Sequence, residues 1–115
     1  MRANKAAIAK LLEITPTFVN QHIVINESIS RRRTLGGHDR HFATQSQFAM
    51  VVKHIHTLIS GTQLQFDNGE GAWYGIALEC VVSINDHDPK RLEIIEYFET
   101  ETERKTIIHI TTEDT

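Results

Sequence analysis

The sequence predicts an α+β fold in which a curved antiparallel sheet wraps around helices. The first observation is the stretch 73–85, where alternate side chains can all be buried, so that the period of two predicts one strand much longer than the usual length of about 5–6 residues. The second observation is a strongly helical pattern over residues 45–60, and the third is a pair of strand-like runs after residue 90. A long strand that bends around a helix can enclose a pocket.

The composition narrows the class of protein. The 115 residues predict a single domain over 1–115, and 40% hydrophobic with 23% charged residues is typical of a soluble globular chain. A net charge of −3 argues against nucleic acid or an anionic membrane as the main partner, and the sequence contains no apolar run long enough to span a membrane. Cys80 is the single cysteine, which excludes an internal disulfide and predicts a reducing, cytoplasmic location.

The N-terminal part predicts a helix followed by a strand. Residues 3–14 place Ile8 and Leu11 on one helical stripe, and Pro16 ends the helix because the residue before a proline avoids the helical region. Residues 17–31 then alternate as a strand, with isoleucines on one face that are interrupted by Glu27.

Residues 45–60 predict the second helix. Thr44 and Gln47 have the spacing of a capping box, and apolar residues recur at helical spacing from Phe48 to Ile59. Gly61 is placed to end this helix.

Residues 62–112 predict a four-stranded antiparallel meander. Its turns are Asp67-Asn68-Gly69-Glu70-Gly71, Asp86-His87-Asp88-Pro89-Lys90 and a reversal around Glu103. If Asn85 lies opposite Arg91, then Glu96 lies opposite Cys80, and the last turn places it beside Ile110 on an otherwise apolar face.

Glu96 and Glu27 are therefore the candidate catalytic residues. A carboxylate in apolar surroundings suits general acid or base chemistry, because burial disfavours its charged form. The alternative for each glutamate is a position at a strand edge or a bulge, where the side chain reaches water. Cys80 on the same face is expected to be a small buried hydrophobe rather than a nucleophile.

The opposite face of the meander offers a different site. It would carry Glu79, Tyr97 and His109 in one cross-strand row, next to Trp73 and Ile95. This row could be a catalytic grouping, but a face this apolar also favours a subunit interface, and we expect a homodimer through it.

Two histidine patterns raise the question of a metal. His38-Asp39-Arg40-His41 supplies two imidazoles in a polar loop, whereas zinc needs three or four ligands, so we expect no metal centre and place His38 at the mouth of the pocket. His54-Ile55-His56 resembles the metal-binding motif of HUH nucleases, in which Tyr97 would be the nucleophile. On the predicted helix these two imidazoles would point apart, which argues against this alternative.

The order of elements resembles the nuclear transport factor 2-like superfamily, which includes ketosteroid isomerases and polyketide cyclases. The resemblance runs from Ile23 to Thr112, through HIVINESIS, the Leu35-Gly36-Gly37 turn, FAMVVKHIHTLI, LQFDNGEGAWYGIALECVVSI and IEYFETETERKTIIHITTED. It implies a cone-like α+β barrel that binds a small apolar molecule and dimerises through the outer sheet face; we expect no cofactor.

No functional residue carries over from the family by sequence match, but its enzymatic members use a pocket carboxylate as base, and the candidate residues are assigned roles on that pattern. Glu96 would be the general base and Glu27 its partner in an isomerase or cyclase reaction on a small carbonyl compound. Tyr74, Phe98 and Ile110 would line the pocket, with His38 near its mouth. The alternatives are a non-catalytic dimeric interaction module of the same fold and a metal-dependent HUH-type nuclease.

Overall fold

The computed structural model describes residues 4–35, 38–57, 61–98 and 101–111, with the backbone alone described over 32–35 and 38–42. The described residues form an α+β fold of antiparallel sheets. Its elements are α1 (Lys5–Ile14), η1 (Thr15–Phe18), β1 (His22–Leu35), β2 (His38–Val51), β3 (His54–Thr57), β4 (Gln63–Asp67), β5 (Trp73–Ala77), η2 (Leu78–Cys80), β6 (Val81–Asp88), β7 (Arg91–Phe98) and β8 (Thr102–Thr111).

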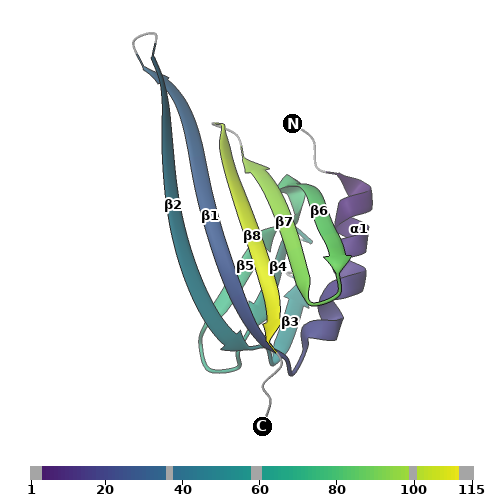
Figure 1. Ribbon diagram of the computed structural model, residues 1–115. Coiled ribbons are helices and arrows are strands. Elements are labelled where there is room, and N and C mark those ends of the chain that lie inside the picture. Colours follow the sequence, from purple (N-terminus) through teal and green to yellow (C-terminus); the bar gives the residue numbers. More distant parts are fainter. Residues whose placement is uncertain (1–3, 36–37, 58–60, 99–100, 112–115) are drawn as a thin grey trace.

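The larger sheet has five strands in the order β2-β1-β8-β7-β6. β1 and β2 pair without interruption over 14 residues each, from His22 opposite Val51 to Leu35 opposite His38. β1 pairs with β8 only from His22 to Arg31, so that residues 32–35 of β1 and 38–41 of β2 continue past the end of β8 as a short two-stranded arm (Figure 1).

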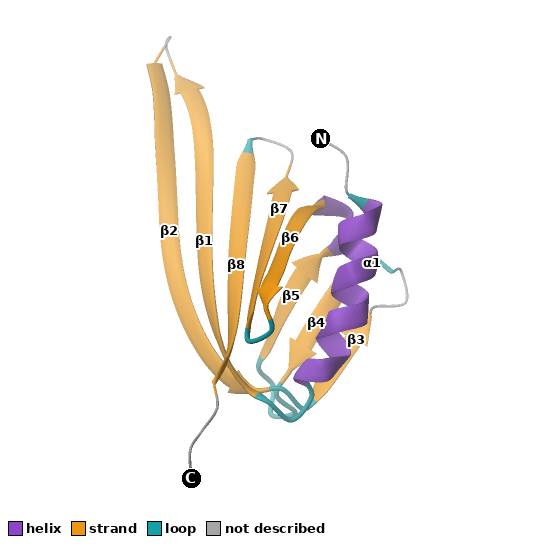
Figure 2. Cartoon of the chain, turned by 45° about the vertical axis from the view of Figure 1, so that its right-hand side comes forward, coloured by secondary structure: helices purple, strands orange, loops and turns teal. Residues whose placement is uncertain are grey.

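The smaller sheet has three strands in the order β3-β4-β5. It lies with α1 on one side of the bent larger sheet (Figure 2). The core between these layers includes side chains from all three, each 1% exposed or less, among them Leu11 from α1, Ile25, Ile94 and Ile108 from the larger sheet, and Leu64, Phe66 and Ile76 from the smaller.

The N-terminal helix is confirmed, but the strand after it starts later than expected. The side chain of Asn4 caps α1 by accepting a hydrogen bond from the backbone N–H of Ala7 at 3.1 Å. Pro16 ends the α-helix as expected, and the chain continues as the 3₁₀ turn η1. β1 consequently begins at His22 rather than at residue 17.

The helix expected over 45–60 is wrong, because the described residues in this range form the end of β2 and the strand β3. The range holds several β-branched residues, which favour strands, and its apolar positions fit a period of two as well as a helical period. The long pairing with β1 therefore outweighs the local capping-box signal at Thr44.

The single long strand expected over 73–85 is also wrong. η2 divides it into β5, which belongs to the smaller sheet, and β6, which belongs to the larger. The alternation is buried as expected up to Leu78, and beyond η2 its phase changes, so that Val81 is buried while Cys80 is half-buried.

The remaining strands pair in sequence order, but in a different register from the expected one. Glu96 lies opposite Val81 and Arg104, instead of opposite Cys80 and Ile110. The last hairpin turns earlier than Glu103: Phe98 pairs with Thr102, and Glu101 adopts a positive φ of 56°. The register error hides the partner of Glu96, which is decisive for the site.

Candidate functional site: a buried arginine–carboxylate network

Glu96 occupies the centre of the inner face of β7. Its neighbours Leu92 and Ile94 alternate with it on the same buried face, and Glu96 itself is 0% exposed. A charged carboxylate at such a position is costly unless several donors bind it. Glu96 has these donors, because one oxygen accepts a hydrogen bond from the backbone N–H of Ala77 at 2.8 Å and both oxygens bind Arg104.

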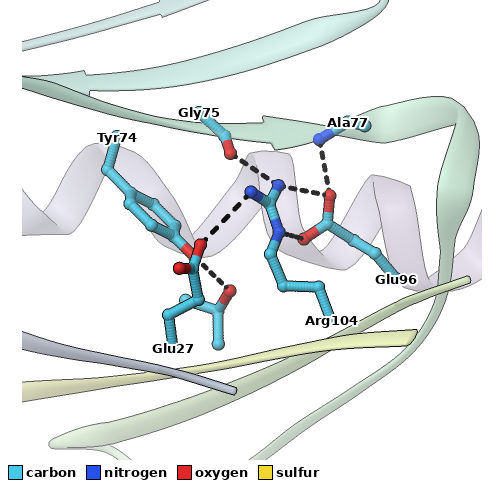
Figure 3. A network of polar contacts seen from close by, with 7 residues as sticks. Glu27, Tyr74, Gly75, Ala77, Glu96 and Arg104 are labelled. Atoms are coloured by element: carbon cyan, nitrogen blue, oxygen red, sulfur yellow. Dashed lines mark hydrogen bonds and ion pairs between the residues drawn. The ribbon is translucent and has the colours of Figure 1, made fainter. Parts of the chain in front are cut away.

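Arg104 reaches this face from β8, directly opposite Glu96 in the sheet. Its Nε and Nη2 atoms each donate to a different oxygen of Glu96 at 2.7 Å, which is the bidentate geometry of a strong ion pair. Nη2 also donates to the backbone carbonyl of Gly75 at 2.8 Å. Arg104 thus links β8 of the larger sheet to β5 of the smaller one (Figure 3).

Glu27 and Tyr74 extend the same network toward β1 (Figure 3). Oε2 of Glu27 lies 3.5 Å from Nη1 of Arg104 and accepts the hydroxyl hydrogen bond of Tyr74 at 3.1 Å. Since Tyr74 has a single hydroxyl proton, the buried Thr106 hydroxyl, 2.7 Å away, donates to the tyrosine oxygen. Hereafter we call Glu27, Tyr74, Glu96, Arg104 and Thr106 the buried network.

The electrostatics of the network follow from burial and pairing. Burial by itself lowers the pKa of Arg104, but the hydrogen bonds and charge of Glu96 reverse this effect and raise the pKa above its ordinary value. Burial also raises the pKa of Tyr74 above that of a free phenol, against the opposing effects of Thr106 and Arg104. Arg104 therefore stays charged and Tyr74 neutral at physiological pH.

The chemistry open to this network is limited. Three donors occupy the two oxygens of Glu96, so the carboxylate is committed to holding Arg104 rather than poised to take a proton from a substrate. Glu96 is not among the residues that line four surface pockets of the described part of the chain. Sequence analysis correctly placed Glu27 and Glu96 in one site. It was wrong to expect them to be unpaired carboxylates, because both form ion pairs with Arg104.

The structure separates the other predicted pocket residues. Phe98 contacts the network, because the guanidinium carbon of Arg104 lies 5.7 Å from the centre of its ring. Ile110 packs against the core instead. His38 is the first residue of β2 and lies opposite Leu35 at the far end of the arm, and its side chain lies outside the described part of the structure.

Sequence analysis missed Arg104 altogether. The segment 101–105 consists entirely of charged and polar residues, which is the usual appearance of a solvated strand end. The isolated glutamate on a core face was itself a usable signal, because a buried charge is normally paired. Placing the final turn three residues earlier moves the partner of Glu96 by six residues, from Ile110 to Arg104.

The outer-face row of Glu79, Tyr97 and His109 does not form. Glu79 lies in η2, Tyr97 pairs with Glu103, and His109 lies opposite Arg91. The apolar surface expected around this row is divided as well, because Trp73 belongs to the smaller sheet and Ile95 to the larger.

Exposed apolar side chains gather elsewhere, in a surface groove of about 320 Å³ between β2 and β5. We call it the Phe48–Trp73 groove; it is lined by Phe48, Ala49, Met50, Ala72, Trp73 and Tyr74. Phe48 is 42% exposed and Trp73 55% exposed, and the ring of Phe48 lies 5.9 Å from that of Tyr74. The groove therefore lies beside the buried network but presents apolar rather than reactive groups.

The two histidines of the nuclease-like motif lie on a strand, contrary to the expected helix. His54 and His56 are exposed on β3 with ring centres 5.7 Å apart, and His56 Nε2 lies 3.6 Å from Asp67. Tyr97 is in the other sheet. Among residues 4–35, 38–57, 61–98 and 101–111, no three histidine, cysteine or acidic side chains are grouped to bind a metal ion.

Comparisons with protein-family models, curated proteins and solved structures found no match to this chain. Within the described residues, no helix has the length and apolar character needed to cross a bilayer.

Proposed function

We propose that this chain is a non-catalytic interaction module that acts as a homodimer. The observation that carries the proposal is the state of Glu96, which is fully buried and bound by three donors. The group best placed by sequence to be a catalytic base therefore holds two sheets together. The cone-like pocket of the nuclear transport factor 2-like resemblance, with Glu96 as base, is the less favoured proposal for the same reason.

The Phe48–Trp73 groove supports self-association. Large exposed aromatic side chains are enriched in protein interfaces and cost free energy in water. Two of the three large hydrophobic residues that are exposed in the described part of the chain, Phe48 and Trp73, line this one groove. We therefore place the dimer interface at the groove, in place of the outer sheet face expected from the sequence.

Light scattering coupled to size-exclusion chromatography tests this proposal. We expect the wild-type chain to have twice its monomer mass of 13.1 kDa at micromolar concentration. Trp73→Ala should shift the equilibrium toward monomer, whereas Leu12→Ala, which removes a side chain 39% exposed on α1, should not. A wild-type chain that stays monomeric up to high micromolar concentration would reject the proposal.

A second candidate function is the binding of a small apolar molecule in the same groove. Its support is the apolar lining and a size near the lower end of the ligand-pocket range, about 300–1,000 Å³. Trp73 is the only tryptophan in the sequence, so its fluorescence reports on the groove directly. Anilinonaphthalene sulfonate should quench it in the wild type and not in Phe48→Ala, and equal responses would exclude the groove as a ligand site.

A further inference from the structure

The outer edge of β2 is unpaired within the described part of the chain. β2 is the terminal strand of the larger sheet and pairs there with β1 alone. Residues 43–49 are all exposed. Such an edge presents a row of free backbone N–H and C=O groups, which is a template for another strand.

Over residues 42–52 this edge lacks the features that normally prevent pairing, and the charged residues of β2, Asp39 and Arg40, come before this stretch. Residues 42–52 contain neither a charged side chain nor a proline, and the 14 pairs with β1 include no bulge. The opposite edge of the same sheet, β6, is different: it carries Asp86 and Asp88, is followed by Pro89, and shows two register shifts against β7. Natural sheets use these devices to block unwanted pairing, so the two edges differ in what they permit.

We infer that the edge of β2 pairs antiparallel with the β2 edge of a second copy, about a two-fold axis at Ser46, to form one continuous ten-stranded sheet. This inference rests on the proposed homodimer and names its surface and its register. The β2 edges of both copies are paired in such a two-fold contact, so assembly stops at two copies rather than continuing into a fibre.

The register follows from the alternation of β2 and from its sequence. Opposed residues of an antiparallel pair share a face of the sheet, and successive residues alternate between faces, so the axis must pass through a residue. An axis at Ser46 matches like with like on the outer face, where Ala43 faces Ala49 and Gln45 faces Gln47, and sets Thr44 against Phe48 on the inner face. An axis at Gln45 or Gln47 would instead set alanine against glutamine or serine against phenylalanine.

The pairing also covers the Phe48–Trp73 groove. Phe48 and Met50 lie on the inner face of β2, opposite Ile25 and Ile23 of β1. In the inferred register Thr44 of the second copy stands opposite Phe48, at the rim of the groove. An aromatic residue facing a β-branched one is a favourable cross-strand pair. Edge pairing and apolar burial thus belong to one interface.

Two double variants test the register. Gln45→Lys with Gln47→Lys places lysine against lysine at both outer-face pairs, whereas Gln45→Lys with Gln47→Glu places lysine against glutamate at both. Gln45 and Gln47 are exposed and their β1 neighbours Ser28 and Asn26 are uncharged, so both variants should fold. By analytical ultracentrifugation, the lysine pair should dissociate at least about tenfold more readily than the lysine–glutamate pair.

A cross-link provides the second measurement. In a Cys80→Ala background, Ser46→Cys should form a disulfide-linked dimer on mild oxidation, because the two-fold axis brings position 46 against itself within disulfide reach. Ser83→Cys, an exposed serine on the opposite edge strand β6, is the matched control and should stay monomeric under reducing-agent-free gel electrophoresis.

The outcomes separate the two proposals. A monomeric wild type rejects the homodimer and this inference with it. A dimeric wild type whose two glutamine variants dissociate equally, or in which position 46 cross-links no faster than position 83, keeps the homodimer and overturns the β2 edge as its interface.

Discussion

Replacing Glu96 with glutamine should strongly destabilise the fold. The substitution keeps the shape of the side chain but removes its charge and turns one of its two acceptor oxygens into a donor. Three donors converge on Glu96, two from Arg104 and one from Ala77, so the new amide NH₂ must face at least one of them. The variant therefore leaves Arg104 with less charge compensation and a buried donor without an acceptor.

The expected loss is about 3 kcal/mol of unfolding free energy, the lower end of the roughly 3–5 kcal/mol that follows removal of one partner from a buried ion pair. The lower end applies because the Arg104 side chain is 18% exposed and keeps Glu27 at 3.5 Å. Dividing this loss by the unfolding entropy of a chain of this size gives a melting temperature that is about 12 °C lower.

Urea denaturation followed by circular dichroism measures the effect. Glu93→Gln is the control, because Glu93 lies on the opposite face of the same strand and meets Lys105 at 3.7 Å in a partly exposed pair. That partly exposed pair should contribute about 1 kcal/mol or less. If Glu96→Gln costs no more than Glu93→Gln, the network does not hold the two sheets together as described.

Two further predictions concern Tyr74 and Glu101. Because burial raises the pKa of Tyr74 in the folded state, the stability that this residue contributes is complete below about pH 10 and is lost as the pH rises further. In the variant Tyr97→Phe, which leaves Tyr74 as the single tyrosine, tyrosinate absorbance should therefore appear together with unfolding. Ionisation of Tyr74 in the folded chain would contradict this prediction. Glu101→Gly should raise the unfolding free energy by roughly 0.5–1 kcal/mol, because Glu101 has a φ of +56° that glycine adopts without strain. Asn20→Gly should change the unfolding free energy less, since asparagine tolerates its φ of +69°. Equal shifts in melting temperature for the two variants would count against strain at Glu101.

The sequence predicted the α+β class with antiparallel sheets, and several local features, for sound physical reasons. The hairpin loop between Asp67 and Trp73 formed as expected, with Gly69 and Gly71 supplying the positive φ values that the turn requires. The inner face of β7 was also identified, because alternation alone determines which residues share a face. These features depend on neighbours in the sequence.

The errors concern long-range pairing. The range 45–60 satisfies both a helical and a strand pattern, and its outcome depends on β1, which lies more than 20 residues away at the base of the hairpin. The final turn contains no glycine, and Glu101 takes the positive φ instead, so composition gave no sign of it. Because the turn was predicted at the wrong residue, Arg104 was not placed opposite Glu96. Glu96 was therefore interpreted as an isolated base rather than as one partner of an ion pair.

Amide hydrogen exchange along β2, measured at several protein concentrations, tests the central claim most directly. Free edge amides exchange quickly, whereas amides bonded to another strand are protected. The homodimer through β2 predicts that alternate amides over residues 43–50 become protected as concentration rises, while those of the opposite edge strand β6 do not change. Protection along β2 that is independent of concentration would contradict it.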